Sequence, residues 1–465
     1  MTTPQTLFDK LWAAHEIMRR DDGMSLLWVD RHLVHEGSHH AFAKLAQRGL
    51  KVAEPDLTFA VVDHYAPTRP GAVAPDIRRM IDTLGQNARA QGIRLFDLHD
   101  PGQGIVHVLG PEQGLTLPGL LINCGDSHTS THGALGALAF GVGATEVAHI
   151  LATQTIWQRR PKTMRISVNG ALGAGVTAKD LALHWIAELG ADGARGHAIE
   201  YAGSAVEALS IEGRLTLCNL SIEGGARLGL IAPDQITFDY LKGRNFAPKG
   251  AAWEAALADW QKLYSDAVAI FDQEVAIEAA EIAPTVTWGT SPEEALPITG
   301  RVPRPADLPG GKQDQARATL AYMGLEAGMP LEDIAVDQVF IGSCTNGRIE
   351  DLRLAAKVLA GRQAKVPGLV SPGSAVVKKQ AEAEGLAQIF TDAGLEWADA
   401  GCSMCVGMNG DLVEAGKRCA SSTNRNFRGR QGRGARTHLM SPAMVAAAAV
   451  TGHLADVRPL LEGRS

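Results

Sequence analysis

Three cysteines in two glycine-containing loops are the residues of this sequence whose types and spacing most directly suggest chemistry. Cys402 and Cys405 form a Cys-x-x-Cys pair flanked by glycine, and Cys344 lies in a second glycine-bearing loop upstream. Thiolates are ligands for soft metals and, when activated, redox nucleophiles. The question is which centre would use three such groups rather than two or four.

Three kinds of centre fit these cysteines, and the residues alone leave all three open. A structural zinc site needs four ligands; His438 is the nearest downstream candidate for the fourth, but a second Cys-x-x-Cys pair is missing. A redox dithiol would use Cys402 and Cys405 only, which leaves Cys344 without a role. An iron–sulfur cluster on three thiolates leaves one iron without a protein ligand, and that iron could bind a substrate oxygen as a Lewis acid.

Acids and histidines follow two apolar stretches, residues 57–62 and 120–124, that have the composition of buried strands. Because α/β proteins place ligands at the carboxyl ends of sheet strands, we predict an acid–base site there. An Asp that merely caps the next helix would explain one such loop, but two in one chain favour the acid–base site. The loop residues are Asp63 and His64 after the first stretch, and Asp126, Ser127 and His128 after the second.

Two other polar features accompany these loops. Asn219 and Glu223 would share one face of a helix, and their apolar neighbours indicate a partly buried face where both need partners. Residues 421–436 carry five arginines and three glycines without apolar periodicity, which predicts a loop. Such a loop could bind RNA or grip small carboxylates through paired guanidinium contacts. Phe427 is its only aromatic residue, so small anions are favoured.

Alternating apolar and amphipathic stretches predict an α/β fold, and no internal repeat is detectable. Thr177 is expected to cap a helix. The predicted strands are 57–62, 120–124, 163–168 and 336–341, and the predicted helices are 76–90, 145–158, 181–189, 348–359 and 374–384.

Length and one Pro/Gly-rich stretch predict the domain organisation. At 465 residues the chain is too long for a single core, and residues 288–315 are rich in proline and glycine. We predict two intertwined α/β domains with the acid–base loops in residues 1–290. A linker region would follow in 291–330, and an α/β domain with the cysteines and the arginine-rich loop in 331–465.

Composition describes an ordinary globular protein. Hydrophobic residues make up 45% and the net charge is −7, so no basic field indicates nucleic acid or an anionic membrane. We expect a cytoplasmic protein, because no targeting segment or membrane-length apolar run is evident. A disulfide framework is not expected in so long a chain, and metal binding or catalysis better explains the cysteines. The six cysteines are Cys124, Cys218, Cys344, Cys402, Cys405 and Cys419.

Seven motifs make the chain resemble the large subunits of the 3-isopropylmalate dehydratases (isopropylmalate isomerases) of leucine biosynthesis, within the aconitase superfamily. The resemblance runs from about residue 6 to about residue 453. The motifs are residues 30–36 (Asp-Arg-His-Leu-Val-His-Glu), 62–64 (Val-Asp-His), 126–129 (Asp-Ser-His-Thr), 218–223 (Cys-Asn-Leu-Ser-Ile-Glu), 342–346 (Gly-Ser-Cys-Thr-Asn), 401–405 (Gly-Cys-Ser-Met-Cys) and 422–430 (Ser-Thr-Asn-Arg-Asn-Phe-Arg-Gly-Arg).

This resemblance implies an aconitase-like α/β fold of three αβα domains around a central iron–sulfur cluster, without the swivel domain. It implies that Cys344, Cys402 and Cys405 hold a 4Fe–4S cluster in which one iron has no protein ligand. It implies catalytic roles for Asp63, His64, Asp126, His128, His107 and Glu223, with Asp63 and His64 protonating the departing hydroxyl. It implies substrate-binding roles for Asn219, Ser127, Asn424, Arg425, Arg430 and His35.

The implied activity is a hydro-lyase that interconverts 2-isopropylmalate and 3-isopropylmalate through isopropylmaleate. In aconitase a fourth, swivelling domain supplies a serine base and a further arginine, and in the isopropylmalate enzymes that domain is a separate small subunit. This sequence ends at Ser465 without such a domain. We therefore expect a small-subunit partner, and we expect the chain alone to hold the cluster without the proton-abstracting base.

Several positions depart from the family pattern near the implied site, namely Gly37, Ser38, Tyr65, Gly347, Val406 and Gly407. None is an implied ligand or acid–base residue, so the implied cluster and reaction type stand. They could reshape the alkyl pocket, and such pockets discriminate single methylenes by only ~1–3 kcal/mol. Paralogues that act on 2-methylmalate/citraconate or 2,3-dimethylmalate/dimethylmaleate remain alternatives. A more distant alternative is a protein that binds RNA when it lacks the cluster, and the acidic net charge disfavours it.

Overall fold

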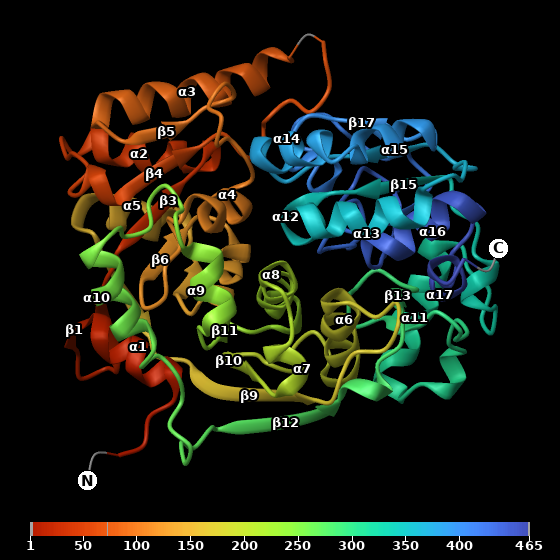
Figure 1. Cartoon of the computed structure of the whole chain (residues 1–465), viewed down its shortest axis with the longest axis horizontal. Helices are drawn as coiled ribbons and strands as arrows, with labels where there is room; N and C mark the ends of the chain where they lie inside the picture. The colour runs from red at the N-terminus through yellow and green to blue at the C-terminus, as the bar shows by residue number, and fades with distance from the viewer. Residues whose placement is uncertain (1–2, 72, 464–465) are drawn as a thin grey trace. The chain divides into compact units, whose positions relative to one another are not determined.

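A computed structural model describes residues 3–71 and 73–463 of the chain. The chain folds into two compact units, and Figure 1 labels many of their helices and strands. Unit 1 comprises Met1–Ala66, Gly71–Gly170 and Ala194–Ile277, and unit 2 comprises Pro67–Pro70, Ala171–Gly193 and Glu278–Ser465. Among the described residues, no helix is both long and apolar enough to cross a membrane.

Unit 1 is built on a parallel sheet with the strand order β5-β4-β3-β6-β7. The chain runs outward from the central strand β3 through β4 to β5, then returns to the other side of β3 for β6 and β7. This reversal is a topological switch point, where α/β sheets form a crevice outside the carboxyl ends of their strands. The strands are β3 (Arg31–Val34), β4 (Thr58–Val61), β5 (Arg94–Phe96), β6 (Leu121–Cys124) and β7 (Leu138–Gly141).

Alternate side chains of these strands face opposite layers of helices, as the period of a strand requires. Val34 and Ala60 pack in one core with α2, α3 and α5, whereas Leu33 and Val61 pack in another with α4. The sheet is therefore the middle layer of an αβα sandwich, buried on both faces. The helices are α2 (His39–Gln47), α3 (Pro75–Gln91), α4 (Val106–Gln113) and α5 (Ala144–Thr153).

Unit 1 also contains a three-stranded antiparallel sheet, β1-β2-β8, and a four-stranded sheet, β11-β10-β9-β12. The strands are β1 (Glu16–Arg19), β2 (Met24–Trp28), β8 (Thr155–Arg159), β9 (Lys162–Asn169), β10 (His197–Ala202), β11 (Leu228–Ile231) and β12 (Gln273–Glu278). The helices are α1 (Leu7–His15), η1 (Glu36–Ser38), η2 (Pro55–Leu57), η3 (Ser127–Leu135), α7 (Ser204–Glu207), α8 (Ile211–Leu220), η4 (Ser221–Gly224), α9 (Gln235–Leu241) and α10 (Ala251–Trp260).

Unit 2 repeats the strand order of unit 1 in a second parallel sheet, β17-β16-β15-β18-β19. Its central strand, β15, is again the first in sequence, so this sheet also has a switch point beside that strand. The strands are β15 (Gln338–Ile341), β16 (Gly368–Val370), β17 (Glu396–Trp397), β18 (Arg418–Ser421) and β19 (Arg436–Leu439).

The helices of unit 2 include α13 (Ile349–Leu359), which contacts α14 (Ala375–Ala383), α15 (Leu386–Asp392) and α16 (Pro442–Thr451). The β13–β14 hairpin (Thr285–Thr287 and Ala295–Pro297) contacts α6 (Ala178–Leu189). The remaining elements are η5 (Ala279–Glu281), η6 (Pro305–Asp307), α11 (Gly310–Met323), η7 (Leu331–Asp333), α12 (Ser343–Asn346), η8 (Ser403–Cys405) and α17 (Arg458–Leu461).

Two of the predicted helical features differ from the structure. The helix predicted over 145–158 ends at Thr153, because Gln154 adopts a left-handed φ of 55° and the following residues pair with β2 as strand β8. Asn219 and Glu223 are not on one continuous α-helix, since α8 ends at Leu220 and a 3₁₀ turn follows. Thr177 does cap α6, in a reciprocal capping box with Asp180.

Candidate active site

The switch point of the unit 1 sheet gathers the predicted acid–base loops. His35 and Glu36 follow the central strand β3, Asp63 and His64 follow β4, and Asp126 follows β6. These three strands are neighbours in the sheet. Side chains from separate parts of the sequence therefore meet at one edge, as predicted for a ligand site in an α/β sheet.

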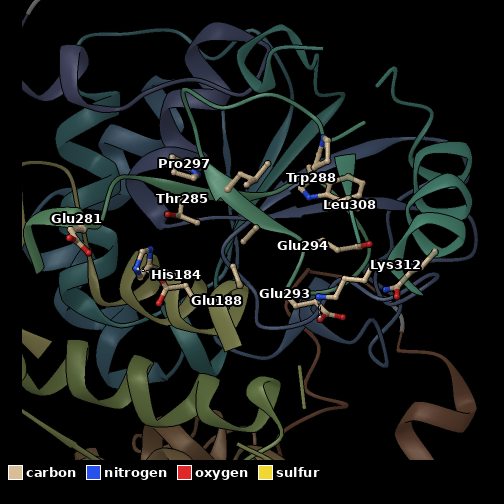
Figure 2. A pocket seen from close by; sticks show the side chains of 15 residues that line it. His184, Glu188, Glu281, Thr285, Trp288, Glu293, Glu294, Pro297, Leu308 and Lys312 are labelled. Atoms are coloured by element: carbon tan, nitrogen blue, oxygen red, sulfur yellow. Dashed lines mark ion pairs between the residues drawn. The ribbon is translucent and has the colours of Figure 1, made fainter. Parts of the chain in front are cut away.

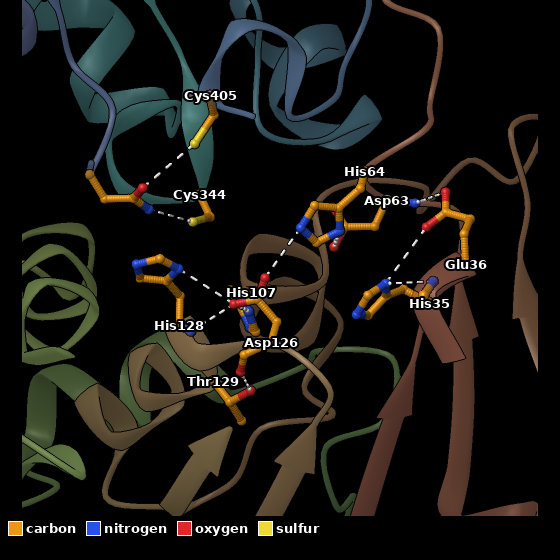
Figure 3. Close-up of polar contacts among 12 residues, drawn as sticks. His35, Glu36, Asp63, His64, His107, Asp126, His128, Thr129, Cys344 and Cys405 are labelled. Carbon is orange, nitrogen blue, oxygen red and sulfur yellow. Dashed lines mark hydrogen bonds and ion pairs between the residues drawn. The ribbon is translucent and has the colours of Figure 1, made fainter. Parts of the chain in front are cut away.

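His64 lies between two carboxylates (Figure 3). Its Nδ1 is 3.3 Å from Asp63 Oδ2, and its Nε2 is 3.2 Å from Asp126 Oδ2. Burial disfavours the charged ring, but the two carboxylates outweigh it and raise the pKa of His64 well above its usual value. Asp63 is buried, which opposes its ionisation, but the His64 charge prevails and lowers the pKa of Asp63. His64 is thus held as an imidazolium, a proton donor.

Asp126 is the centre of the network. Its Oδ1 lies 3.2 Å from His107 Nε2 and 3.4 Å from His128 Nδ1, and accepts the backbone N–H of His128 at 2.6 Å. Burial opposes ionisation here too, but the histidine contacts prevail and lower the pKa of Asp126 well below its usual range. His107 comes from α4, and its Nδ1 lies 3.1 Å from His132 Nε2. A permanently charged carboxylate therefore orients three imidazoles.

The predicted residues of α8 and η4 extend the same network. His128 Nε2 lies 3.0 Å from Glu223 Oε1, so the ring bridges Asp126 and Glu223. Asn219 is fully buried, and its amide donates to Thr131 Oγ1 at 2.8 Å. Ser127 lines a hollow of about 260 Å³ in unit 1, whose other lining residues are Gly141, Val142, Ile222, Ala226 and Arg227.

Glu36 is a site residue that sequence reasoning did not single out. It is fully buried, and its Oε1 accepts the backbone N–H groups of Asp63 at 2.9 Å and Tyr65 at 3.3 Å. It thereby fixes the backbone of the Asp63–His64 loop. The motif of residues 30–36 contained the signal, since an acid that directly follows a buried strand needs a partner. His35, its neighbour, has its ring 4.8 Å from the ring of His64.

Gly37, one of the departures from the family pattern, lies against the ring of His35. A Cβ placed on Gly37 would come within 2.8 Å of His35 Cε1. A larger residue there would displace the imidazole of His35 from its place beside His64. Burial and the charge of His64 lower the pKa of His35 to about 4, so this ring is neutral where His64 is charged.

Replacing Glu36 with glutamine is expected to change how stability depends on pH. Burial and the nearby Asp63 charge raise the pKa of Glu36 from 4.5 to about 7. Because the pKa of Glu36 is raised in the folded state, the protonated side chain stabilises the protein below pH 4.5. This stabilisation is lost as the pH rises through 7. Between pH 5 and pH 8, the free energy of unfolding of Glu36→Gln should therefore rise relative to that of the wild type by about 2.5 kcal/mol.

Chemical denaturation of both proteins at the two pH values measures this difference. Glu54→Gln is the matched control, because Glu54 is exposed at the start of η2 in the same unit. It should follow the wild type at both pH values. Parallel pH dependences for wild type and Glu36→Gln would contradict the assignment.

The three predicted ligand cysteines all lie in loops that follow strands of the unit 2 sheet. Cys344 follows β15, and Cys402 and Cys405 lie in the loop after β17. All three are buried and none forms a disulfide. The Asn424 amide donates to Cys344 Sγ at 3.4 Å, and the Cys405 thiol donates to Asn424 Oδ1 at 3.6 Å (Figure 3). One amide therefore bridges two of the thiols.

The backbone of both cysteine loops is strained. Ser343, directly before Cys344, has a φ of 87°, and Ser403, directly after Cys402, has a φ of 46°. Among the described non-glycine residues, only Gln154 shares this left-handed conformation. Such strain costs about 1–3 kcal/mol per residue and persists where a site requires it. Buried cysteines outside any disulfide, held on strained loops, are a donor set that fits an iron–sulfur cluster.

The alternative of a zinc site completed by His438 does not fit. His438 is fully buried in β19, where its Nδ1 lies 2.6 Å from the Thr287 carbonyl and its Nε2 lies 2.9 Å from Arg418 Nη1. Burial and the Arg418 charge lower the pKa of His438 to about 3. Both ring nitrogens already have partners, so His438 is a core residue and not a metal ligand.

The segment that carries Asn424 is anchored by a buried lysine. Lys179, in the first turn of α6, is fully buried and donates to the carbonyls of Ser422, at 3.1 Å, and Thr423. The adjacent arginine-rich segment contains no helix or strand between β18 and β19, as predicted. Gln431 joins it to the cysteine loop by donating to the Met404 carbonyl at 3.1 Å.

The two arginines predicted to bind substrate differ in their surroundings. Arg425 is partly buried, directly after Asn424. Arg430 is also partly buried, and its guanidinium lies 5.6 Å from the centre of the Phe427 ring. The Nε of Arg430 is buried and has no hydrogen-bond partner in the described structure. Arg430 therefore keeps a donor available beside the cysteine-bearing part of unit 2.

A separate hollow of about 380 Å³ in unit 2 contains none of the predicted site residues (Figure 2). It lies between α6, the β13–β14 hairpin and α11, with Trp288 and Leu308 among its apolar walls. Two ion pairs lie within it, with His184 3.5 Å from Glu188 and Lys312 3.6 Å from Glu293. The described residues of this hollow therefore form ordinary surface ion pairs and no connected acid–base network.

Comparison with known proteins identifies the family of this chain. The profile of the Aconitase family (aconitate hydratase) matches residues 9–452. A similar solved structure is the holo-form of aconitase X from Thermococcus kodakaraensis, with 13% sequence identity, coverage of 94% of this chain and 90% of that chain, and a TM-score of 0.47. The family consists of hydro-lyases that generally bind a 4Fe–4S cluster, and the predicted superfamily and αβα fold are confirmed. The chain belongs to the aconitase family.

Proposed function

We propose that this chain is the large subunit of a 4Fe–4S hydro-lyase that interconverts 2-isopropylmalate and 3-isopropylmalate through isopropylmaleate, in leucine biosynthesis. The observation that carries the acid–base part is His64 between Asp63 and Asp126, at 3.3 and 3.2 Å. The seven sequence motifs shared with isopropylmalate dehydratases support the substrate.

Cys344, Cys402 and Cys405 would hold the cluster. When bound, the cluster supplies one iron without a protein ligand, which acts as a Lewis acid for substrate oxygen. Asn424 orients two of the thiols, and Lys179 fixes the segment from which Asn424 projects.

The acid–base residues move the protons of dehydration and rehydration. His64, held as an imidazolium, gives a proton to the departing hydroxyl, and its carboxylate partners keep the ring oriented while it is neutral. In the reverse direction the neutral ring takes a proton from water. His107 and His128 hold Asp126 in place from its other side. Glu36 holds the loop that presents His64.

The proposal includes a small partner subunit that supplies the base for proton abstraction. Turnover by the reconstituted chain should therefore depend on that partner. Full turnover by the chain alone, loaded with iron and sulfide, would refute the need for a partner. A colourless protein after anaerobic reconstitution would refute the cluster.

A substrate panel tests the alkyl specificity. The reconstituted chain with its small subunit is expected to hydrate isopropylmaleate in preference to citraconate and dimethylmaleate. Pocket selectivity between such alkyl groups is modest, so ratios of about 10- to 200-fold in kcat/KM are expected. A preference for citraconate or dimethylmaleate would assign the chain to a paralogous dehydratase and leave the cluster chemistry unchanged.

A further inference from the structure

Arg348 carries buried hydrogen-bond donors without partners beside the Cys344 loop. It is the N-cap residue of α13, and its exposed fraction is 3%. Its Nη1 donates to the Thr345 carbonyl at 2.6 Å. Its Nε and Nη2 are buried and have no hydrogen-bond partner in the described structure.

These two donors form one edge of the guanidinium. The N–H groups of Nε and Nη2 point in parallel, in the arrangement that binds both oxygens of one carboxylate. A buried charged donor left unpaired costs several kcal/mol, so a free edge in a folded protein indicates a missing anion.

No carboxylate in the described part of the chain hydrogen-bonds this edge, although Asp351 lies near enough for the Arg348 charge to oppose the rise in the pKa of Asp351 that burial causes. The acid bonded to the backbone of Arg348 is Asp351, which accepts its N–H at 3.0 Å and the side-chain amide of Asn346 at 2.9 Å. The backbone N–H of Arg348 occupies Oδ2 of Asp351, and the Asn346 amide occupies Oδ1. The first contact is part of the capping box of α13. Neither oxygen forms an ion pair with the Arg348 side chain among the described contacts. The helix N-terminus adds partial positive charge at the same place.

We propose that Arg348 binds one carboxylate of the dicarboxylate substrate, as an anchor additional to Arg425 and Arg430. This inference rests on the proposed function for the identity of the substrate and on the free guanidinium edge for the site. Gly347 keeps the anchor close to the cysteine loop. A Cβ on Gly347 would come within 2.8 Å of the Ser343 carbonyl oxygen, so a larger residue would shift the loop from which Arg348 projects.

The test measures binding of maleate, a plain dicarboxylate, to the reconstituted full chain by calorimetry. Arg348→Met should weaken binding about 30- to 100-fold, because it removes two charge-assisted hydrogen bonds. Arg348→Lys should weaken it about 10-fold, since the charge remains and the paired geometry is lost. Maleamide, the uncharged analogue, should bind weakly to all variants.

Arg353→Met is the matched control, because Arg353 lies on the same helix but is half-exposed and pairs with Glu384 at 2.6 and 2.7 Å. It should bind maleate as the wild type does. Iron and sulfide content is measured in parallel. Unchanged maleate binding by Arg348→Met, absent binding by the wild type, or loss of cluster in Arg348→Met would overturn the proposal. A failure of the proposed function would give a different result. The wild-type pair would then not turn over isopropylmaleate, although maleate binding would still depend on Arg348.

Discussion

Cys344→Ala is expected to yield a folded chain that does not develop the brown iron–sulfur absorbance and whose turnover with the small subunit falls at least about 10³-fold. The cysteine is one of three proposed ligands, and Asn424, its hydrogen-bond partner, also contacts Cys405. Loss of Cys344 removes one of the three proposed protein ligands of the cluster. The strained loop at Ser343 then no longer carries a cluster ligand.

Visible absorbance, iron and sulfide content, and turnover measure this result after anaerobic reconstitution. Cys419→Ala is the matched control, since Cys419 is a buried thiol on β18 in the same unit whose pKa burial raises to about 12. A thiol so reluctant to ionise is a poor metal ligand. Cys419→Ala should keep both colour and activity. A brown, active Cys344→Ala protein would exclude the cluster arrangement.

Local features of this chain were predictable because local physics determines them. Residues 57–62 and 120–124 are apolar enough to be buried on both faces, and they form β4 and β6. The capping residue Thr177 specifies the start of α6, and its backbone N–H and its hydroxyl both donate to Asp180 Oδ2. The placement of charged loops after these strands then follows from the general behaviour of α/β sheets.

Contacts across the sequence were not predictable from composition or spacing. The pairing of His107 with Asp126 requires α4 to lie beside the end of β6, which depends on the strand order of the whole sheet. The shared order of the two five-stranded sheets has no counterpart in a sequence repeat. The end of the helix at Thr153 depends on strand pairing of β8 with β2, which overrides local helical propensity.

The remaining features of the site can be recognised only from the conformation and burial of their residues in the structure. The free guanidinium edge of Arg348 is visible only when its surroundings are known, because an arginine after a loop is usually solvated. The same holds for Glu36, whose role depends on two backbone N–H groups of another loop. The family resemblance predicted the chemistry, and the structure showed which groups contact the predicted residues.

His64→Gln is expected to lower kcat about 10²- to 10⁴-fold with little change in KM, since positioned proton transfer contributes about that much to a rate. Glutamine keeps a polar group between Asp63 and Asp126 but cannot exist as a cation. Steady-state kinetics of the reconstituted pair measure the change. His99→Gln is the matched control, because His99 is an exposed histidine of the same unit, and its rates should equal those of the wild type.

Asp126→Asn changes the pKa of His64 while the imidazole itself remains in the site. The two carboxylates raise the pKa of His64, so the wild-type acid remains protonated until pH rises through that elevated value. Removal of one carboxylate charge lowers the pKa of His64, and the alkaline limb of the pH–rate profile should move to lower pH. A purely structural role for Asp126 would reduce the rate at every pH without moving that limb. A shifted limb in Asp126→Asn, together with no such limb in His64→Gln, would assign the alkaline pKa to the proton that His64 donates.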